Sequence, residues 1–261
     1  MSLKGAAYIV GAFEHPTRKA SDKSVSLLHA ECAKGALEDA GLSKDDVDGY
    51  FCAGDAPGLG PLSMVDYMNL KCRHVDSTDV GGSSYQVAVG HALESISAGR
   101  CSIALITLAG RPRSEGMATG TAPRAGNPAQ PEMQFEFPYG PATANMYAMC
   151  AMRHMHEYGT TSEQLAWIKV AASHHAQYNP HAMLRDVVTV EDVVKSPMVA
   201  SPLHRLDCCV ISDGGGALIV TKPEIAKSLK RPKVKVIGIG EFSTSSTVTT
   251  SFNIACGLYC A

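Results

Sequence analysis

Hydrophobic and polar positions recur with two different periods along this chain, and both periods meet in residues 75–110. Between Tyr85 and Ala98 the apolar side chains are spaced as on one face of a helix: Tyr85, Val89, Ala92 and Ile96. Ser102–Leu108 is a continuous apolar run, which is typical of a strand buried on both faces. The glycine-containing residues 79–84 (DVGGSS) come before the helix. The pattern predicts a strand, a tight turn, a helix and a second strand.

A helix entered through glycines presents backbone N–H groups at its start, which stabilise an anion or place a nucleophile. The alternative interpretation is that Gly81 and Gly82 only let the strand and the helix pack tightly.

The remaining apolar segments alternate between strand and helix periods. We expect strands at 6–13, 50–53, 217–220 and 234–239, and helices at 25–40, 62–70 and 223–229. Such alternation predicts an α/β domain with a mainly parallel sheet.

A different pattern begins at Arg111. Residues 111–141 are rich in glycine, proline and charge without a period, and two helices are expected after them, at 142–157 and from 162 to Tyr178. Methionines recur every three residues in the first of these helices, as adaptable core or as the pliable wall of a ligand site: Met146, Met149, Met152 and Met155. The α/β pattern resumes at Asp213, so the block is interpreted as a mostly helical insertion.

Composition and charge argue against several classes of function. The 261 residues carry a net charge of −2 with no basic stripe, which argues against nucleic acid as a partner. No apolar run approaches the length of a membrane span, and the N-terminus lacks the pattern of a secretion signal. Nine cysteines without a CxxC pair favour a reducing, cytoplasmic location. No histidine pair has metal-binding spacing, so we expect no metal site, and Cys208 and Cys209 are expected to be packed in the interior.

Residues 158–220 carry several motifs together: YGTT, EQLA, NP, T-x-EDV, PL-x-x-LDCC and SDGGGA. In these motifs the chain resembles thiolases, most closely the sterol-carrier or lipid-transfer type and acetyl-CoA acetyltransferase-like enzymes. The resemblance implies an α/β thiolase-like fold, with a mixed five-stranded sheet flanked by helices and a mostly helical insertion domain. It divides the chain into an N-terminal domain (1–110 and 208–231), an insertion or loop domain (111–207), and the start of a second half with an unassigned tail (232–261). The rest of the second thiolase half is expected to be missing.

The resemblance also assigns candidate site residues. Asp79 stands where the family has its nucleophilic cysteine. Tyr139 and Met146 would line the pantetheine channel, and Cys209 and Ser212 would contact coenzyme A. Coenzyme A or acyl-CoA is implied as a substrate, and no resident cofactor is expected.

Three functions follow as expectations. The first is a thiolase-like acyltransferase that handles or binds acyl-CoA but is inactive as a thiolase, because its nucleophile and C-terminal catalytic residues are absent. The alternatives are a retro-aldol lyase subunit for β-hydroxyacyl-CoA, which needs an acid–base pair and enolate stabilisation, and a non-catalytic acyl-CoA or lipid-binding scaffold. The family also implies a homodimer through an edge strand near Ser102–Leu108, and a zinc-ribbon and OB-fold protein as a further partner.

Overall fold

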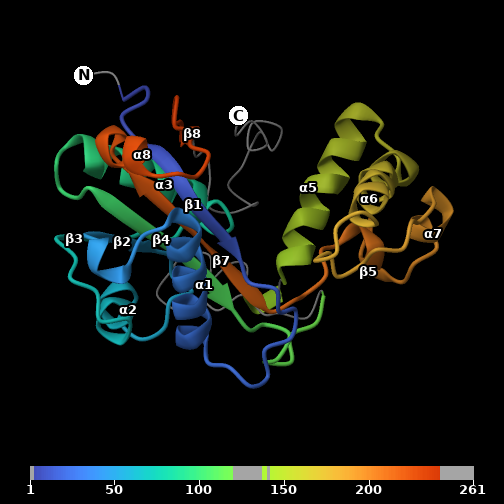
Figure 1. Ribbon diagram of the computed structural model, residues 1–261. Coiled ribbons are helices and arrows are strands. Elements are labelled where there is room, and N and C mark those ends of the chain that lie inside the picture. The colour runs from blue at the N-terminus through green and yellow to red at the C-terminus, as the bar shows by residue number, and fades with distance from the viewer. Residues whose placement is uncertain (1–2, 120–136, 140–141, 242–261) are drawn as a thin grey trace. The chain divides into compact units, whose positions relative to one another are not determined.

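The computed structural model (Figure 1) describes residues 3–119, 137–139 and 142–241. Its chain forms two compact units, which are described separately. The first takes in the residues up to Ser114 and Asp213–Glu241, and the second takes in Glu115–Ser212. Most of the expected loop 111–141 and all of the unassigned tail 242–261 lie outside the described residues. The interpretation of the two units as an N-terminal and an insertion domain stays a prediction.

The first unit is built on a mixed six-stranded sheet with the order β3-β2-β4-β7-β1-β8. The strand bounds are β1 Tyr8–Glu14, β2 Gly49–Cys52, β3 His74–Ser77, β4 Ile103–Gly110, β7 Gly214–Thr221 and β8 Val234–Lys235. Strand β2 runs parallel to β3 and β4, whereas β7 runs antiparallel to both of its neighbours, β4 and β1. The predicted strands at 6–13, 102–108 and 217–220 therefore share one sheet, as expected for the fold.

The alternation of strands and helices predicted a mainly parallel sheet, and this prediction is wrong. The mixed sheet that the family resemblance implied is confirmed. The reason lies where the chain leaves and re-enters the first unit. Strand β4 ends at Gly110, and β7 begins at Gly214, which is the register partner of Gly110. Because the chain returns at the same end of the sheet that it left, β7 has to run back antiparallel. A Cβ on Gly215 would lie 2.2 Å from the Leu108 carbonyl oxygen, so this close approach needs glycine.

The sheet has one short strand more than the five expected. The expected strand at 234–239 is reduced to the two residues of β8, which pair antiparallel with Tyr8 and Ile9. Gly5 N donates to Val236 O over 2.8 Å and Val236 N donates to Ala7 O over 3.1 Å, so the chain closes on the otherwise open side of β1.

The prediction that Ser102–Leu108 forms an edge strand is also wrong. Strand β4 lies inside the sheet between β2 and β7, and β3, which precedes the glycine turn, is at the edge. The interior position explains the apolar run, since Ile103, Ala104, Leu105 and Ile106 are all buried.

Helices cover both faces of this sheet. Helices α1 (Val25–Ala40), α2 (Pro61–Tyr67) and α8 (Pro223–Ser228) pack on one face, and α3 (Ser84–Ser97) packs on the other. Ser24 caps the start of helix α1, where its side chain accepts from Leu27 N, and Gly41 caps the end in the left-handed conformation. A one-turn 3-10 helix, η1 (Lys44–Asp46), follows, with a capping box between Ser43 and Asp46.

The second unit is mostly helical. Its helices are α5 Thr143–Tyr158, α6 Ser162–Ala176 and α7 Val190–Val194, with the 3-10 turns η2 Phe137–Tyr139 and η3 Arg205–Asp207. Thr161 and Gln164 form the capping box at the start of α6. A small antiparallel pair that the sequence did not predict, β5 Met198–Ala200 and β6 Leu203–His204, also belongs to this unit. Met149 and Met152 are 51% and 54% exposed, so the interpretation of the methionine stripe as core is wrong for these two positions.

Candidate functional site

The first unit carries its candidate site where the parallel strands β2 and β3 end. Cys52 and Ser77 are the last residues of these strands and are register partners, so the loop after β2 and the turn after β3 emerge side by side. Thr78 N donates to Cys52 O over 3.3 Å and holds the two exits together. The carboxyl ends of parallel strands are the usual place for ligand-binding loops in open α/β sheets.

The glycine turn before α3 is fixed by its own hydrogen bonds. Gly81 has φ +74°, which favours glycine. Ser84 Oγ donates to Gly81 O over 2.6 Å and accepts from Val80 N over 2.9 Å. The helix therefore starts from a rigid loop, and its N-cap residue, Ser83, makes no side-chain capping bond.

Asp79 is an exposed residue of this turn. Its Oδ1 accepts from Gly81 N over 3.3 Å. The carboxylate also lies against the neighbouring loop, because a Cβ on Gly54 would come within 2.4 Å of Asp79 Oδ2. The carboxylate thus stands at the entry to α3, next to the loop that carries Asp55.

Asp55 has a partner on α3. The Tyr85 hydroxyl donates a hydrogen bond to Asp55 Oδ1. Burial of the ring raises the pKa of the Tyr85 phenol, and the hydrogen bond to Asp55 and the negative charge of Asp55 raise it further. Tyr85 is therefore a neutral phenol at physiological pH, whose oxygen keeps lone pairs to accept a second hydrogen bond.

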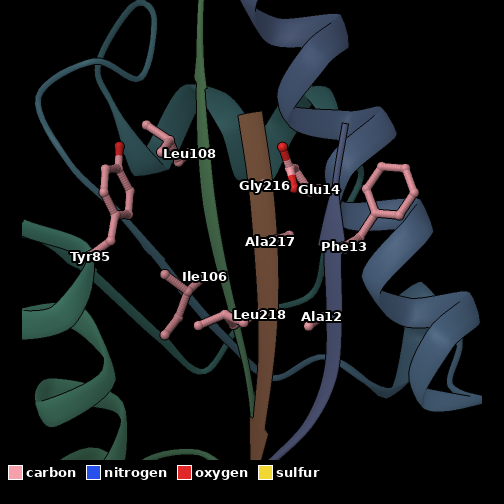
Figure 2. Close-up of a pocket in the computed structure, with 9 residues that line it drawn as sticks. All are labelled: Ala12, Phe13, Glu14, Tyr85, Ile106, Leu108, Gly216, Ala217 and Leu218. Carbon is pink, nitrogen blue, oxygen red and sulfur yellow. The ribbon is translucent and has the colours of Figure 1, made fainter. Parts of the chain in front are cut away.

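Tyr85 lines a hollow of about 350 Å³ on the sheet (Figure 2). Ile106, Leu108 and Leu218 belong to adjacent strands, β4 and β7, and lie on the same side of the sheet as Tyr85, whereas Phe13 points to the α1 side. Leu108 is 40% exposed, which is unusual for an interior strand. The hollow thus combines an apolar floor with the Tyr85 phenol and the Glu14 carboxylate.

None of the four cysteines in the first unit is suited to be a thiolate. Burial raises the pKa of Cys32 and Cys101 to about 12 and that of Cys52 and Cys72 to about 11. A thiol nucleophile needs a pKa near or below neutral pH. Acid–base chemistry by carboxylates and a phenol is what this site offers.

Three buried polar side chains in the core of the first unit form a chain of hydrogen bonds. Thr107 Oγ1 lies 2.7 Å from the Tyr50 hydroxyl and 2.8 Å from His29 Nδ1. His29 is fully buried, and its Nε2 has no partner among the described residues. Burial lowers the pKa of His29, although the charge of Asp55 opposes this shift. His29 is therefore neutral in the folded protein.

The second unit contains a larger hollow of about 690 Å³. Helix α6 contributes Leu165, Ile168 and Lys169 to its lining, and the segment after β6 contributes Arg205 and Cys209. Lys169 and Arg205 beside an apolar wall fit a ligand that carries both phosphates and apolar groups. The lining also contains Asp207, whose Oδ2 accepts from His204 N over 2.8 Å.

The residues predicted to contact coenzyme A fall in this second unit, and Asp79 falls in the first. Cys209 lines the hollow; Tyr139, Met146 and Ser212 are not among its lining residues. Tyr139 is 88% exposed, and Met146 and Ser212 are half-buried. Cys209 is exposed and Cys208 is half-buried, so the expectation of interior packing for this pair is wrong.

Sequence reasoning missed Asp55 and gave Tyr85 only a packing role. Asp55 was part of a glycine–proline loop. A usable signal was present, since Asp55 and Asp79 each follow a predicted strand by a few residues, and adjacent parallel strands place such residues at one edge.

Two further features bear on function, a metal-binding cluster and a membrane-spanning helix. In the described part of the chain, no group of three or more His, Cys, Asp or Glu side chains is arranged to hold a metal ion. Within residues 3–119, 137–139 and 142–241, no helix has both the length and the apolar character needed to cross a bilayer.

Comparison with known proteins identifies the family, although no protein-family model matches the chain. The chain is 31% identical over 224 residues to an acetyl-CoA acetyltransferase of Methanothermobacter thermautotrophicus, covering 84% of this chain and 57% of the relative. It is 33% identical over 248 residues to a steroid side-chain-cleaving aldolase of Thermomonospora curvata, covering 92% of this chain and 63% of the relative. Among solved structures, the Ltp2-ChsH2(DUF35) aldolase matches with a TM-score of 0.84 and 29% identity, over 97% of this chain and 66% of that chain.

The strand order, the glycine-entered helix and these similarities define a thiolase-like fold. The chain belongs to the thiolase superfamily, in its sterol-carrier-type branch. It spans about 57–63% of the length of the curated relatives compared above.

Proposed function

We propose that this protein cleaves a carbon–carbon bond in a β-hydroxyacyl-CoA thioester by a retro-aldol reaction. The observation that carries the proposal is the entry to α3, where Asp79, Asp55 and Tyr85 gather and the first unit offers no ionisable thiol. A retro-aldol step needs a group that removes the β-hydroxyl proton, and a site that accepts the enolate. Asp79 is the proposed group that passes a solvent proton to the enolate carbon.

The similarity to a steroid side-chain-cleaving aldolase over 92% of this chain supports the lyase over an acyltransferase. The apolar floor made by Ile106, Leu108 and Leu218 favours substrates with an apolar group on the β-carbon. An acyltransferase would need a covalent acyl-enzyme, and an anhydride on Asp79 would hydrolyse rather than return its acyl group to a thiol.

For binding, we propose that the hollow of the second unit holds the coenzyme A part of the substrate. Lys169 and Arg205 would face the phosphates, and Leu165 and Ile168 would contact the apolar parts. We expect Lys169→Ala to weaken coenzyme A binding and to reduce its salt dependence. Lys195→Ala, in an exposed ion pair with Glu191 in the same unit, is the control.

We further propose assembly with other chains. Strand β3 is a sheet edge and is a candidate for pairing with a second copy. The similar structure is named Ltp2-ChsH2(DUF35) aldolase. Because this name joins two components, it supports a second protein as a partner of this chain. The seven cysteines that the structure describes are all free thiols, which supports a location in the cytoplasm.

The test is product analysis. The protein is incubated with a β-hydroxyacyl-CoA that has an apolar β-substituent, and the products are separated by mass spectrometry. Retro-aldol cleavage releases a ketone or aldehyde together with a shorter acyl-CoA, without acylated protein. An acylated protein would support the acyltransferase instead, and binding without any product would support the scaffold.

A further inference from the structure

We propose that Tyr85 and Asp55 are the proton relay that removes the β-hydroxyl proton of the substrate. This inference rests on the retro-aldol function proposed above and assigns one of its steps to named atoms. Tyr85 and Glu14 are the polar residues that line an otherwise apolar hollow. Glu14 is paired with Arg18, whereas the Tyr85 hydroxyl donates to a second carboxylate, Asp55.

The geometry places Tyr85 at the hollow and Asp55 behind it. Tyr85 comes from the first turn of α3 and lines the hollow beside Leu108 (Figure 2). Asp55 lies on the exposed loop after β2 and is not among the residues that line the hollow. A substrate in the hollow therefore meets the phenol oxygen first, and the carboxylate acts through the phenol.

The direction of proton movement follows from the charges. Burial and the charge of Asp55 keep the Tyr85 phenol protonated, so it does not act as a free phenolate base. Its oxygen accepts a hydrogen bond from the substrate hydroxyl while its own proton is directed at Asp55 Oδ1. The negative charge needed to pull the proton away is on Asp55, which is exposed to solvent and can exchange protons with water.

The step balances without an oxidant or a metal. The β-hydroxyl proton moves to Tyr85 Oη as the Tyr85 proton moves to Asp55 Oδ1. The electron pair of the O–H bond becomes the second bond of the new carbonyl, and the pair of the Cα–Cβ bond passes into the thioester enolate. The enolate carbon then takes a proton from a water molecule beside Asp79, and the hydroxide that remains takes up the proton that Asp55 releases.

A purely structural role is the competing explanation, since the same hydrogen bond also ties the loop after β2 to α3. The two roles differ in what their loss changes. A structural bond affects stability and substrate binding, whereas a relay affects kcat and its pH dependence.

The experiment compares Tyr85→Phe, Asp55→Asn and Asp55→Glu in the full chain, with Tyr67→Phe and Asp66→Asn as controls. Tyr67 and Asp66 are exposed residues of α2, outside the site. We expect Tyr85→Phe and Asp55→Asn to lower kcat for cleavage by about 10²-fold or more, the usual contribution of general acid–base catalysis. KM, acyl-CoA binding and the thermal midpoint stay close to those of the controls, and Asp55→Glu restores part of kcat.

The pH profile provides the second readout. Tyr85→Phe and Asp55→Asn are expected to change the pH dependence of kcat, whereas Tyr67→Phe and Asp66→Asn leave it as in the wild type. Cleavage by the wild type with unchanged kcat in Tyr85→Phe overturns the relay but leaves the lyase function intact. A drop in kcat that is matched by lost binding or a lowered thermal midpoint also overturns it, in favour of the structural role. A wild type that binds acyl-CoA and yields no cleavage product overturns the proposed function and the relay together.

Discussion

The Tyr50 hydroxyl lies 2.7 Å from Thr107 Oγ1, and this hydrogen bond joins the neighbouring strands β2 and β4 inside the core. Both residues are fully buried, and His29 Nδ1 of α1 meets the same Thr107 oxygen at 2.8 Å. With neutral His29, one arrangement gives both contacts at Thr107 Oγ1 a donor and an acceptor, although His29 Nε2 has no partner among the described residues. Tyr50 donates to Thr107, Thr107 donates to His29 Nδ1, and the remaining proton of His29 is on Nε2. Burial raises the pKa of the Tyr50 phenol, so it remains the donor.

Thr107→Val tests how much this chain of hydrogen bonds stabilises the first unit. Valine keeps the shape of threonine but leaves the Tyr50 hydroxyl and His29 Nδ1 without their shared partner. Each buried polar group left unsatisfied costs about 1–3 kcal/mol, so we expect the free energy of unfolding to fall by about 2 kcal/mol or more. Urea unfolding followed by circular dichroism measures the change. Thr143→Val, at an exposed position of α5, is the matched control. Equal stability of the two variants would contradict the expectation.

The pH dependence of stability follows from His29. Burial lowers its pKa in the folded protein below the unfolded value of about 6.5. The unfolded chain therefore binds more protons between these two pKa values, and stability rises with pH through that window. The contribution of neutral His29 is fully present above about pH 6.5 and is lost as the pH falls below it. Thermal midpoints measured from pH 8 to pH 5 test this, and His29→Gln is expected to flatten the decline. A midpoint that is constant over this range would count against it.

Asp213 stabilises the place where the chain re-enters the first unit. Its Oδ1 accepts from Arg113 N at 2.8 Å and Ser114 N at 3.1 Å, and its Oδ2 accepts from Ala20 N at 2.7 Å and from the Ser114 hydroxyl. Burial alone would raise the pKa of Asp213, but these hydrogen bonds outweigh it and lower the pKa. The stabilisation is therefore present above the unfolded pKa of about 4 and is lost as the pH falls below it.

We expect Asp213→Asn to destabilise the protein by at least about 2 kcal/mol, because the amide turns an NH₂ group toward backbone donors. The variant should also lose the part of the acid dependence below pH 4 that the carboxylate provides. Asp66→Asn, an exposed carboxylate on α2, is the control for the loss of charge. Urea midpoints at pH 7 test the first statement, and midpoints followed from pH 4 down to about pH 2 test the second. A variant as stable as the control at pH 7 would show that the hydrogen bonds of Asp213 do not stabilise the fold.

The sequence predicted those parts of the fold that depend on local periodicity. Helix α3 was expected at 85–98 and lies at Ser84–Ser97, because side chains along one helix face repeat within a few residues. The order of the strands in the sheet does not follow from local periodicity. The place of β7 between β4 and β1 depends on pairing over more than 100 residues, and it follows only from where the chain leaves and returns.

The family resemblance assigned Asp79 to the candidate site, and its role stays a prediction. Tyr85 and Asp55 are 30 residues apart and meet only through the parallel pairing of β2 with β3, so the sequence did not bring them together. The chain from Tyr50 to His29 spans three elements and has no sequence signature. Long-range polar contacts of this kind appear only once the strands are in register.

The last prediction concerns thiolysis. A thiolase passes the acyl group through a thioester on a cysteine thiolate, and residues 77–84 before α3 contain no cysteine. Cys52, on the adjacent strand, has its pKa raised to about 11 by burial and does not substitute for it. We therefore expect no loss of acetoacetyl-CoA enolate absorbance when the protein is incubated with acetoacetyl-CoA and free coenzyme A.

Asp79→Cys provides the matched gain of function. Its thiol would stand at the N-terminus of α3, where backbone N–H groups lower a thiol pKa, so we expect one new thiol that reacts rapidly with iodoacetamide at neutral pH. With acetyl-CoA this variant should accumulate a covalent acyl group, visible by intact-protein mass spectrometry. Asp79→Ser is the control, because it keeps a small side chain without a thiolate. Thiolysis by the wild type that disappears in Asp79→Ala would show that the carboxylate itself transfers the acyl group, and that the acid–base interpretation of this turn is wrong.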